Sequence, residues 1–177
     1  ISHIAIDGKT LRASYDKAME KGAIHMVSAW VVDNGIVLGQ VKTGEKSNEI
    51  TAIPELLKQI ELKGVIVSID AMGTQTAIAG QIIEQKGDYV LALKGNHSSL
   101  HDQVCMFFED KEHASSGLDH FETVDGDHGR IETRRYATCG DISWLQGKEN
   151  WAGLKTITQV QRERHVGDKV SIETSYY

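Results

Sequence analysis

Short apolar runs open the chain and are separated by turn signals. Residues 4–6 form an apolar run that stops at Asp7, which is typical of a buried strand ending at a turn. Residues 24–32 and 36–41 are apolar stretches that flank Asn34 and Gly35, and both of these turn residues accept a positive φ. The pattern therefore predicts a first strand followed by a two-stranded antiparallel hairpin.

A helical pattern follows the hairpin. Apolar residues recur at helical spacing, and Pro54 fits such a helix only in its first turn, so we expect the helix to begin near Thr51. Residues 65–69 then predict a second buried strand, which ends at Asp70 as the first ends at an aspartate.

The same alternation continues through two more helices. A second helix is expected from a cap at Thr74 to Gly87, followed by a strand at residues 89–93. Ser99 and Asp102 have the spacing of a capping box, which predicts a third helix. The resulting order of three strands and then alternating helices and strands predicts an α/β fold.

The last third of the chain reads as strands without helices. Residues 130–138, 154–164 and 170–177 are the expected strands, and Gly167 and Asp168 form a turn between the last two. We therefore predict a β-rich segment after the α/β part.

Composition places the chain among globular domains. Its 177 residues contain 40% hydrophobic residues and one proline, which excludes disordered and proline-rich classes. No apolar run approaches the roughly 18 to 20 residues that a membrane helix needs, so no membrane partner is expected. Cys105 and Cys139 are far apart and lack CxxC spacing, which predicts reduced thiols. The net charge is −6, and the acidic stretch 102–127 is expected to be a solvated surface.

Two aspartates, Asp7 and Asp70, carry the candidate chemistry. If a right-handed crossover places their strands side by side, both carboxylates reach the same edge of the sheet. Paired carboxylates are oxygen ligands that suit Mg²⁺ or Mn²⁺, and such ions activate an attacking hydroxyl in phosphoryl transfer. Aspartates at strand ends are also ordinary turn formers, and this alternative stays open.

Five ordered motifs resemble the DDE transposases of bacterial insertion sequences, nearest to the H-repeat-associated group. They begin at Ala5 (AIDGKTLR), Lys46 (KSNEI), Ser68 (SIDAMGTQ), Ala92 (ALKGN) and His128 (HGRIETR). The resemblance implies a ribonuclease-H-like mixed sheet, with three antiparallel strands and then parallel strands with helices, and a β-rich insertion. On this basis we expect a partial catalytic core at 1–112 and the insertion, preceding the last core helix, at 113–177.

The resemblance also implies a function. Family members cut and join DNA at transposon ends with divalent metal held by three carboxylates, of which Asp7 and Asp70 match the first two. The third, a glutamate on a helix, is expected beyond Tyr177, so that no third acid lies within the chain. The N-terminal region of the family is expected before Ile1. We therefore expect this fragment to have little or no activity. The whole protein is expected to be bacterial, to act in the cytoplasm in association with the nucleoid, and to be able to form a homodimer.

Basic and polar residues are candidates for DNA contacts. Lys9, Lys94 and Asn96 follow strands at the edge expected to hold the carboxylates, although loop lysines are commonly just exposed.

A second basic group lies in the β-rich segment and comprises His128, Arg130 and Arg134. The two arginines share one face of a strand, where they can contact phosphates or form an ion-pair ladder on the surface.

Two rival functions stay open. The chain can be a non-catalytic DNA-binding or assembly remnant of a decayed mobile element. It can also be another ribonuclease-H-like nuclease whose third acid is internal, with Glu122, Glu132 and Glu173 as candidates.

Overall fold

The computed structural model describes residues 2–10, 25–43, 49–110, 117–127 and 129–177. The chain divides into two compact units, each with its own sheet. The first unit comprises Ile1–Ala92 and Asn150–Gly153, and the second comprises Leu93–Glu149 and Leu154–Tyr177. The division at residue 112 expected from the family resemblance stays a prediction.

The first unit contains a five-stranded mixed sheet with the order β3-β2-β1-β4-β5. β1 pairs antiparallel with β2, and β2 pairs antiparallel with β3, whereas β1–β4 and β4–β5 are parallel pairs. This is the predicted mixed sheet of three antiparallel strands followed by parallel strands. The strands are β1 (Ser2–Thr10), β2 (His25–Val31), β3 (Ile36–Thr43), β4 (Val65–Ile69) and β5 (Asp88–Leu91).

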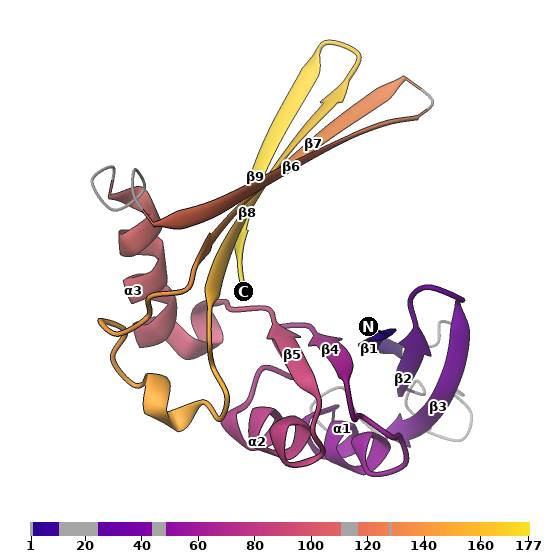
Figure 1. The fold of residues 1–177 in the computed structure, drawn as a ribbon. Helices are drawn as coiled ribbons and strands as arrows, with labels where there is room; N and C mark the ends of the chain where they lie inside the picture. The colour runs from indigo at the N-terminus through magenta and orange to yellow at the C-terminus, as the bar shows by residue number, and fades with distance from the viewer. Residues whose placement is uncertain (1, 11–24, 44–48, 111–116, 128) are drawn as a thin grey trace, which may run out of the picture. The chain divides into compact units, whose positions relative to one another are not determined.

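The helices α1 (Glu49–Leu57) and α2 (Thr76–Glu84) pack on one face of this sheet (Figure 1). Alternate strand residues supply the apolar side of that interface, and Ile6 and Ile69 are 4% exposed. Trp30 and Val90 lie in one row on the opposite face, with Ala5 and Ser68 between them. Both large side chains of this row are more than 40% exposed, so within the described residues nothing covers this row as the helices cover the other face.

Two predicted helix caps are wrong. α2 begins at Thr76 behind Gln75, because the Thr74 hydroxyl instead donates to the backbone oxygens of Asp70 and Ala92. α3 (Ser98–Glu109) follows the 3₁₀ turn η2 (Gly95–His97), and its N-cap residue makes no side-chain capping bond, so the expected capping box is absent there.

The second unit contains a four-stranded antiparallel sheet with the order β6-β7-β8-β9. One of its strands, β6, was not predicted, because its polar and acidic residues resemble a solvated segment. The strands are β6 (Leu118–Asp127), β7 (Arg130–Cys139), β8 (Ile157–Val166) and β9 (Lys169–Tyr176).

The core of the second unit lies where α3 packs near one end of the sheet (Figure 1). Val104 and Phe108 of α3 join Cys139 and Ile157 of the sheet in one buried cluster. The distal parts of the strands extend beyond this cluster, and Phe121 on β6 is 67% exposed. Among the described residues, no helix combines the length and apolarity required to cross a bilayer.

Candidate functional site

Asp7 and Asp70 follow a pair of opposed residues on adjacent parallel strands. Ile6 on β1 lies opposite Ile69 on β4, so the next residue on each strand is an aspartate. Neighbouring strands are about 4.8 Å apart, which keeps the two backbones within the span of carboxylates that share a cation. Both aspartates are exposed. The expected adjacency of the two strands is confirmed, whereas the catalytic and metal-binding roles stay predictions.

Asp7 does not end its strand, in contrast to the prediction. β1 continues to Thr10 because its antiparallel pairing with β2 persists, with Asp7 opposite Ser28. Only the parallel pairing with β4 stops, since β4 itself ends at Ile69. Asp7 is therefore held by a strand on one side and faces the end of β4 on the other.

The turn after β4 holds the backbone of Asp70. Its Oδ1 accepts hydrogen bonds from the backbone amides of Met72 (3.1 Å) and Gly73 (3.4 Å). Gly73 is required by packing, because a Cβ there would lie 2.3 Å from Cγ2 of Ile69 and 2.7 Å from Cδ1 of Ile53. Asp70 thus holds the turn through Oδ1. A carboxylate has two oxygens, so Oδ2 can still bind a cation.

A hydrogen bond joins the two candidate strands beside the aspartates. His3 Nε2 and Ser68 Oγ are 2.8 Å apart. Strand alternation places His3 on the same face as Asp7, four residues later. Sequence reasoning missed this contact, although the two-residue period of His3, Ala5 and Asp7 was visible in the sequence.

The donor set at this edge fits part of a hard-cation site. Two carboxylates from adjacent strands supply oxygen ligands, which Mg²⁺ and Mn²⁺ prefer. Within the part of the chain that the structure describes, no three His, Cys, Asp or Glu side chains gather as a metal site.

The predicted DNA-contact residues are distributed over both units. Lys9 lies on the same strand face as Asp7, two residues along β1, and is exposed. Lys94 and Asn96 are exposed at the 3₁₀ turn η2 and belong to the second unit. His128 lies outside the described residues. Arg130 is exposed at the start of β7.

Arg134 belongs to an ion-pair network centred on Glu132. Its guanidinium donates to Glu132 Oε1 and, at 3.4 Å, to Asp125 Oδ2. Arg164 donates from Nε to Glu132 Oε2 at 3.2 Å. Burial raises the pKa of Glu132, but the hydrogen bond from Arg164 and the charges of Arg134 and neighbouring arginines outweigh it, so this pKa lies below its ordinary value. The network matches the ion-pair ladder that was one of the two predicted alternatives.

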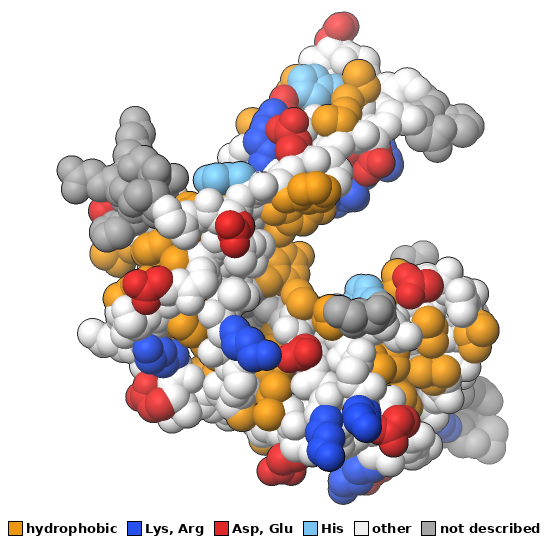
Figure 2. Space-filling view, in the orientation of Figure 1, with side chains coloured by type: hydrophobic (Ala, Val, Ile, Leu, Met, Phe, Trp, Pro, Cys, Tyr) orange, Lys and Arg blue, Asp and Glu red, His pale blue; other side chains and the backbone are white. Residues whose placement is uncertain are grey.

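The three internal acids proposed as a third catalytic carboxylate are all paired with arginines on their own sheet. Glu122 accepts from Arg135 at 2.9 Å, Glu132 is bound as described, and Glu173 accepts from Arg162. Acidic and basic side chains lie side by side over the strands of this sheet in Figure 2. This pairing favours structural roles for the three glutamates.

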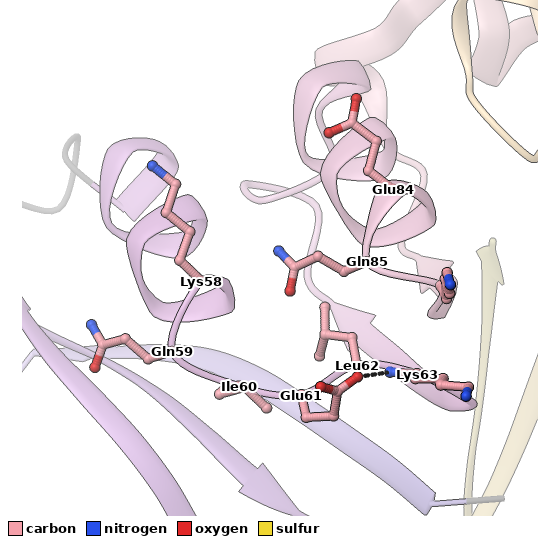
Figure 3. A pocket seen from close by; sticks show the side chains of 9 residues that line it. Lys58, Gln59, Ile60, Glu61, Leu62, Lys63, Glu84 and Gln85 are labelled. Atoms are coloured by element: carbon pink, nitrogen blue, oxygen red, sulfur yellow. Dashed lines mark hydrogen bonds between the residues drawn. The ribbon is translucent and has the colours of Figure 1, made fainter.

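A cleft of about 460 Å³ lies at the opposite end of β4 from Asp70. It is formed by residues 58–63 and by the end of α2, and it contains none of the predicted site residues (Figure 3). Glu61 Oε1 accepts a hydrogen bond from the backbone amide of Lys63 at 3.2 Å within it.

Comparison with known proteins identifies the family. Residues 1–164 match the family model described as Transposase DDE domain. The chain belongs to this family.

Relatives of this DDE domain include proteins named as transposases. It is 49% identical over 155 residues to "Putative transposase YncI" of Escherichia coli O157:H7, covering 87% of this chain and 40% of that protein. It is 46% identical over 156 residues to "H repeat-associated putative transposase YhhI" of E. coli K12, covering 87% of this chain and 41% of that protein. The resemblance to the H-repeat-associated group is thereby confirmed.

The DDE domain chain is shorter than its relatives. It matches the "Uncharacterized protein in dhlA 3′region" of Xanthobacter autotrophicus with 45% identity over 175 residues, which is 98% of this chain and 58% of that protein. The chain therefore spans between 40% and 58% of the length of these three relatives. A piggyBac transposase synaptic complex with hairpin DNA aligns with 75% of this chain and 30% of that one, at 12% identity and a TM-score of 0.41, which is too distant to bear on the site.

Proposed function

We propose that this domain is the catalytic-core portion of a DDE transposase whose whole protein cuts and joins DNA strands by metal-dependent phosphoryl transfer at insertion-sequence ends. The observation that carries the proposal is the placement of Asp7 and Asp70 directly after the opposed residues Ile6 and Ile69. Such a pair on adjacent strands is suited to share a divalent cation.

Asp7 and Asp70 would hold Mg²⁺ or Mn²⁺ through carboxylate oxygens. When bound, the metal lowers the pKa of an attacking hydroxyl and stabilises the leaving oxygen. The chain's own contribution is to position the ligands: β1 fixes Asp7 through its pairing with β2, and the Met72 and Gly73 amides hold one oxygen of Asp70. The turn also limits the rotamers of Asp70, so less conformational entropy is lost when a cation binds.

The third carboxylate of this proposed site is a glutamate on a helix outside residues 1–177. Trp30 and Val90, exposed on one face of the first sheet among the described residues, support a further element packing there. The greater length of the relatives is consistent with such an element. The fold of the complete core would then be ribonuclease-H-like, and this chain alone would bind metal weakly and have little or no activity, because two ligands do not define a two-metal geometry.

DNA is the proposed partner of the whole protein. Its proposed contacts come from three places in the chain. They are Lys9, two residues after Asp7, then Lys94 and Asn96 at η2, and finally His128, Arg130 and Arg134. Their charged and polar groups suit phosphate oxygens, which position a duplex without reading its sequence. The whole protein is proposed to act as a homodimer in the bacterial cytoplasm, associated with the nucleoid.

A cleavage assay with a protein of the relatives' full length tests the proposal. We expect Mg²⁺-dependent nicking of DNA that carries the element's ends, and we expect Asp7→Asn and Asp70→Asn each to reduce the rate by at least about 10³-fold, because each removes a metal ligand. Asp33→Asn, at the exposed turn after β2, is the matched control and should retain activity.

Two outcomes would contradict the proposal. Cleavage that survives either substitution at Asp7 or Asp70 would exclude the assigned ligands. Full metal-dependent cleavage by residues 1–177 alone would show that the third acid is internal.

A further inference from the structure

One face of the β6–β9 sheet carries arginines around the buried carboxylate of Glu132. Arg134 lies opposite Arg162 across β7 and β8, and Glu132 lies opposite Arg164. Residues opposed in an antiparallel sheet project to the same face, as do residues two apart on one strand, which adds Arg130. We call the surface formed by these four arginines the arginine face.

Glu132 is the fixed centre of the arginine face. Its side chain is 2% exposed, although it lies on a sheet surface, because the arginines cover it. One oxygen accepts from Arg134 and the other from Arg164, so both arginines are held by the same carboxylate. The two arginine side chains are still 37% and 40% exposed. A guanidinium has five N–H groups, so each arginine has donors left after binding Glu132.

Two further acids among the described side chains of the arginine face are bound differently. Asp125 pairs with Arg134, and Glu173 pairs with Arg162, but their side chains are 69% and 61% exposed. Ion pairs in water contribute little net free energy, so an incoming anion can replace either acid at low cost. Replacing Glu132 would instead remove the one carboxylate that Arg134 and Arg164 share.

We propose that Glu132 is a positioning residue that orients Arg134 and Arg164 toward DNA phosphates, and that Asp125 and Glu173 are counter-charges which those phosphates displace. The inference rests on the proposed function, since it takes DNA as the partner. The planar fork of arginine matches phosphate oxygens, and fixing it before binding reduces the conformational entropy lost on binding. The exposed acids neutralise the surface when no DNA is bound.

The proposal predicts opposite effects from identical changes in charge. Glu132→Gln, Asp125→Asn and Glu173→Gln each remove one negative charge from the same face. If net charge alone governs binding, all three raise affinity for DNA. If Glu132 positions the arginines, only the substitutions at Asp125 and Glu173 raise it.

Fluorescence anisotropy separates these accounts. It measures the affinity of the 177-residue chain for a labelled DNA duplex of arbitrary sequence at low and at moderate salt. We expect Glu132→Gln to weaken binding about tenfold, because two charge-assisted arginine contacts lose their orientation. Asp125→Asn and Glu173→Gln should each tighten binding about twofold, since each releases an arginine from an exposed pair.

A second pair of variants keeps the test valid if Glu132→Gln fails to fold. Arg164→Lys preserves charge but removes the Nε bond and the fork, and it should weaken binding. Arg135→Lys is the matched control, because Arg135, on the neighbouring strand β7, projects to the opposite face of the same sheet and pairs with Glu122 and Glu163. Circular dichroism and thermal unfolding establish that each variant is folded.

The outcomes distinguish this inference from the function on which it rests. Tighter binding by Glu132→Gln, or unchanged binding by Arg164→Lys, overturns the positioning role while DNA binding stands. If the wild-type chain does not bind the duplex even at low salt, DNA binding by this chain is itself wrong, and the positioning role falls with it.

Discussion

The two sheets of the molecule hold their acidic residues in opposite ways. In the first sheet Asp7 and Asp70 are exposed at the end of a parallel strand pair, and the described contacts of Asp70 use one oxygen. In the second sheet Glu132 is buried, and each of its oxygens is bound by an arginine. An acid with an unused oxygen can take a cation, whereas an acid surrounded by arginines serves to organise its neighbours.

The largest effect on stability should come from removing the charge of Glu132. Glu132→Gln leaves Arg134 and Arg164 close together without their shared counter-charge, which is strongly unfavourable at a buried position. We expect a clear drop in Tm and faster amide hydrogen exchange in β7 and β8.

Asp70→Asn is the matched comparison for that substitution. The asparagine side chain can still accept the turn hydrogen bonds from Met72 and Gly73, so the unfolding free energy should change by less than about 0.5 kcal/mol. A similar loss of stability in both variants would remove the distinction between the two kinds of acid.

A smaller loss is expected from Gly73→Ala. The added Cβ would overlap Cγ2 of Ile69, which branches directly from its Cβ and has little freedom to move. Overpacking of this kind costs about 1 to 3 kcal/mol. Chemical denaturation with a reporter in the first unit measures the loss, and Gly80→Ala is the control because nothing lies within 4 Å of a Cβ there. Equal stability of the two variants would show that the turn accommodates a side chain.

A partial loss of stability should also appear on acidification. Hydrogen bonds from Arg135 lower the pKa of Glu163, and the arginines lower that of Glu132. A carboxyl whose folded pKa lies below its unfolded value stabilises the fold above the unfolded pKa, and this contribution is lost as the pH falls through the folded pKa. The free energy of unfolding of the second unit should therefore fall below about pH 4.3.

Unfolding measured from pH 7 to pH 3 checks this prediction. Glu132→Gln removes one of the carboxyls whose pKa is lowered in the second unit, so the variant should lose less stability over the same range. An identical pH dependence in wild type and variant would mean that Glu132 titrates alike in the folded and unfolded chains.

Much of the first unit could be predicted from the sequence because its strands are short apolar runs. The apolar runs before Asp7 and Asp70 led directly to β1, β4 and their pairing. Strand β6 was missed because its exposed acidic residues hide the two-residue period. Thr74 was mistaken for a helix cap because the nearer of its two acceptors, the backbone oxygen of Ala92 at 2.7 Å, lies 18 residues away in the sequence.

The role of Glu132 could not be predicted from local sequence for the same reason. Its partner Arg164 is 32 residues away, and only the pairing of β7 with β8 brings the two together. The sequence pattern indicated which residues share a strand face. It did not indicate that Glu132 on that face would be buried and that Asp125 and Glu173 would be exposed.

The central claim is that Asp7 and Asp70 share a divalent cation. A crystal structure of the chain soaked in Mn²⁺, with anomalous difference maps, tests it most directly. The account predicts a manganese peak in contact with carboxylate oxygens of both aspartates, with waters completing its coordination. Ordered Asp7 and Asp70 carboxylates that point apart, with no peak between them, would contradict it.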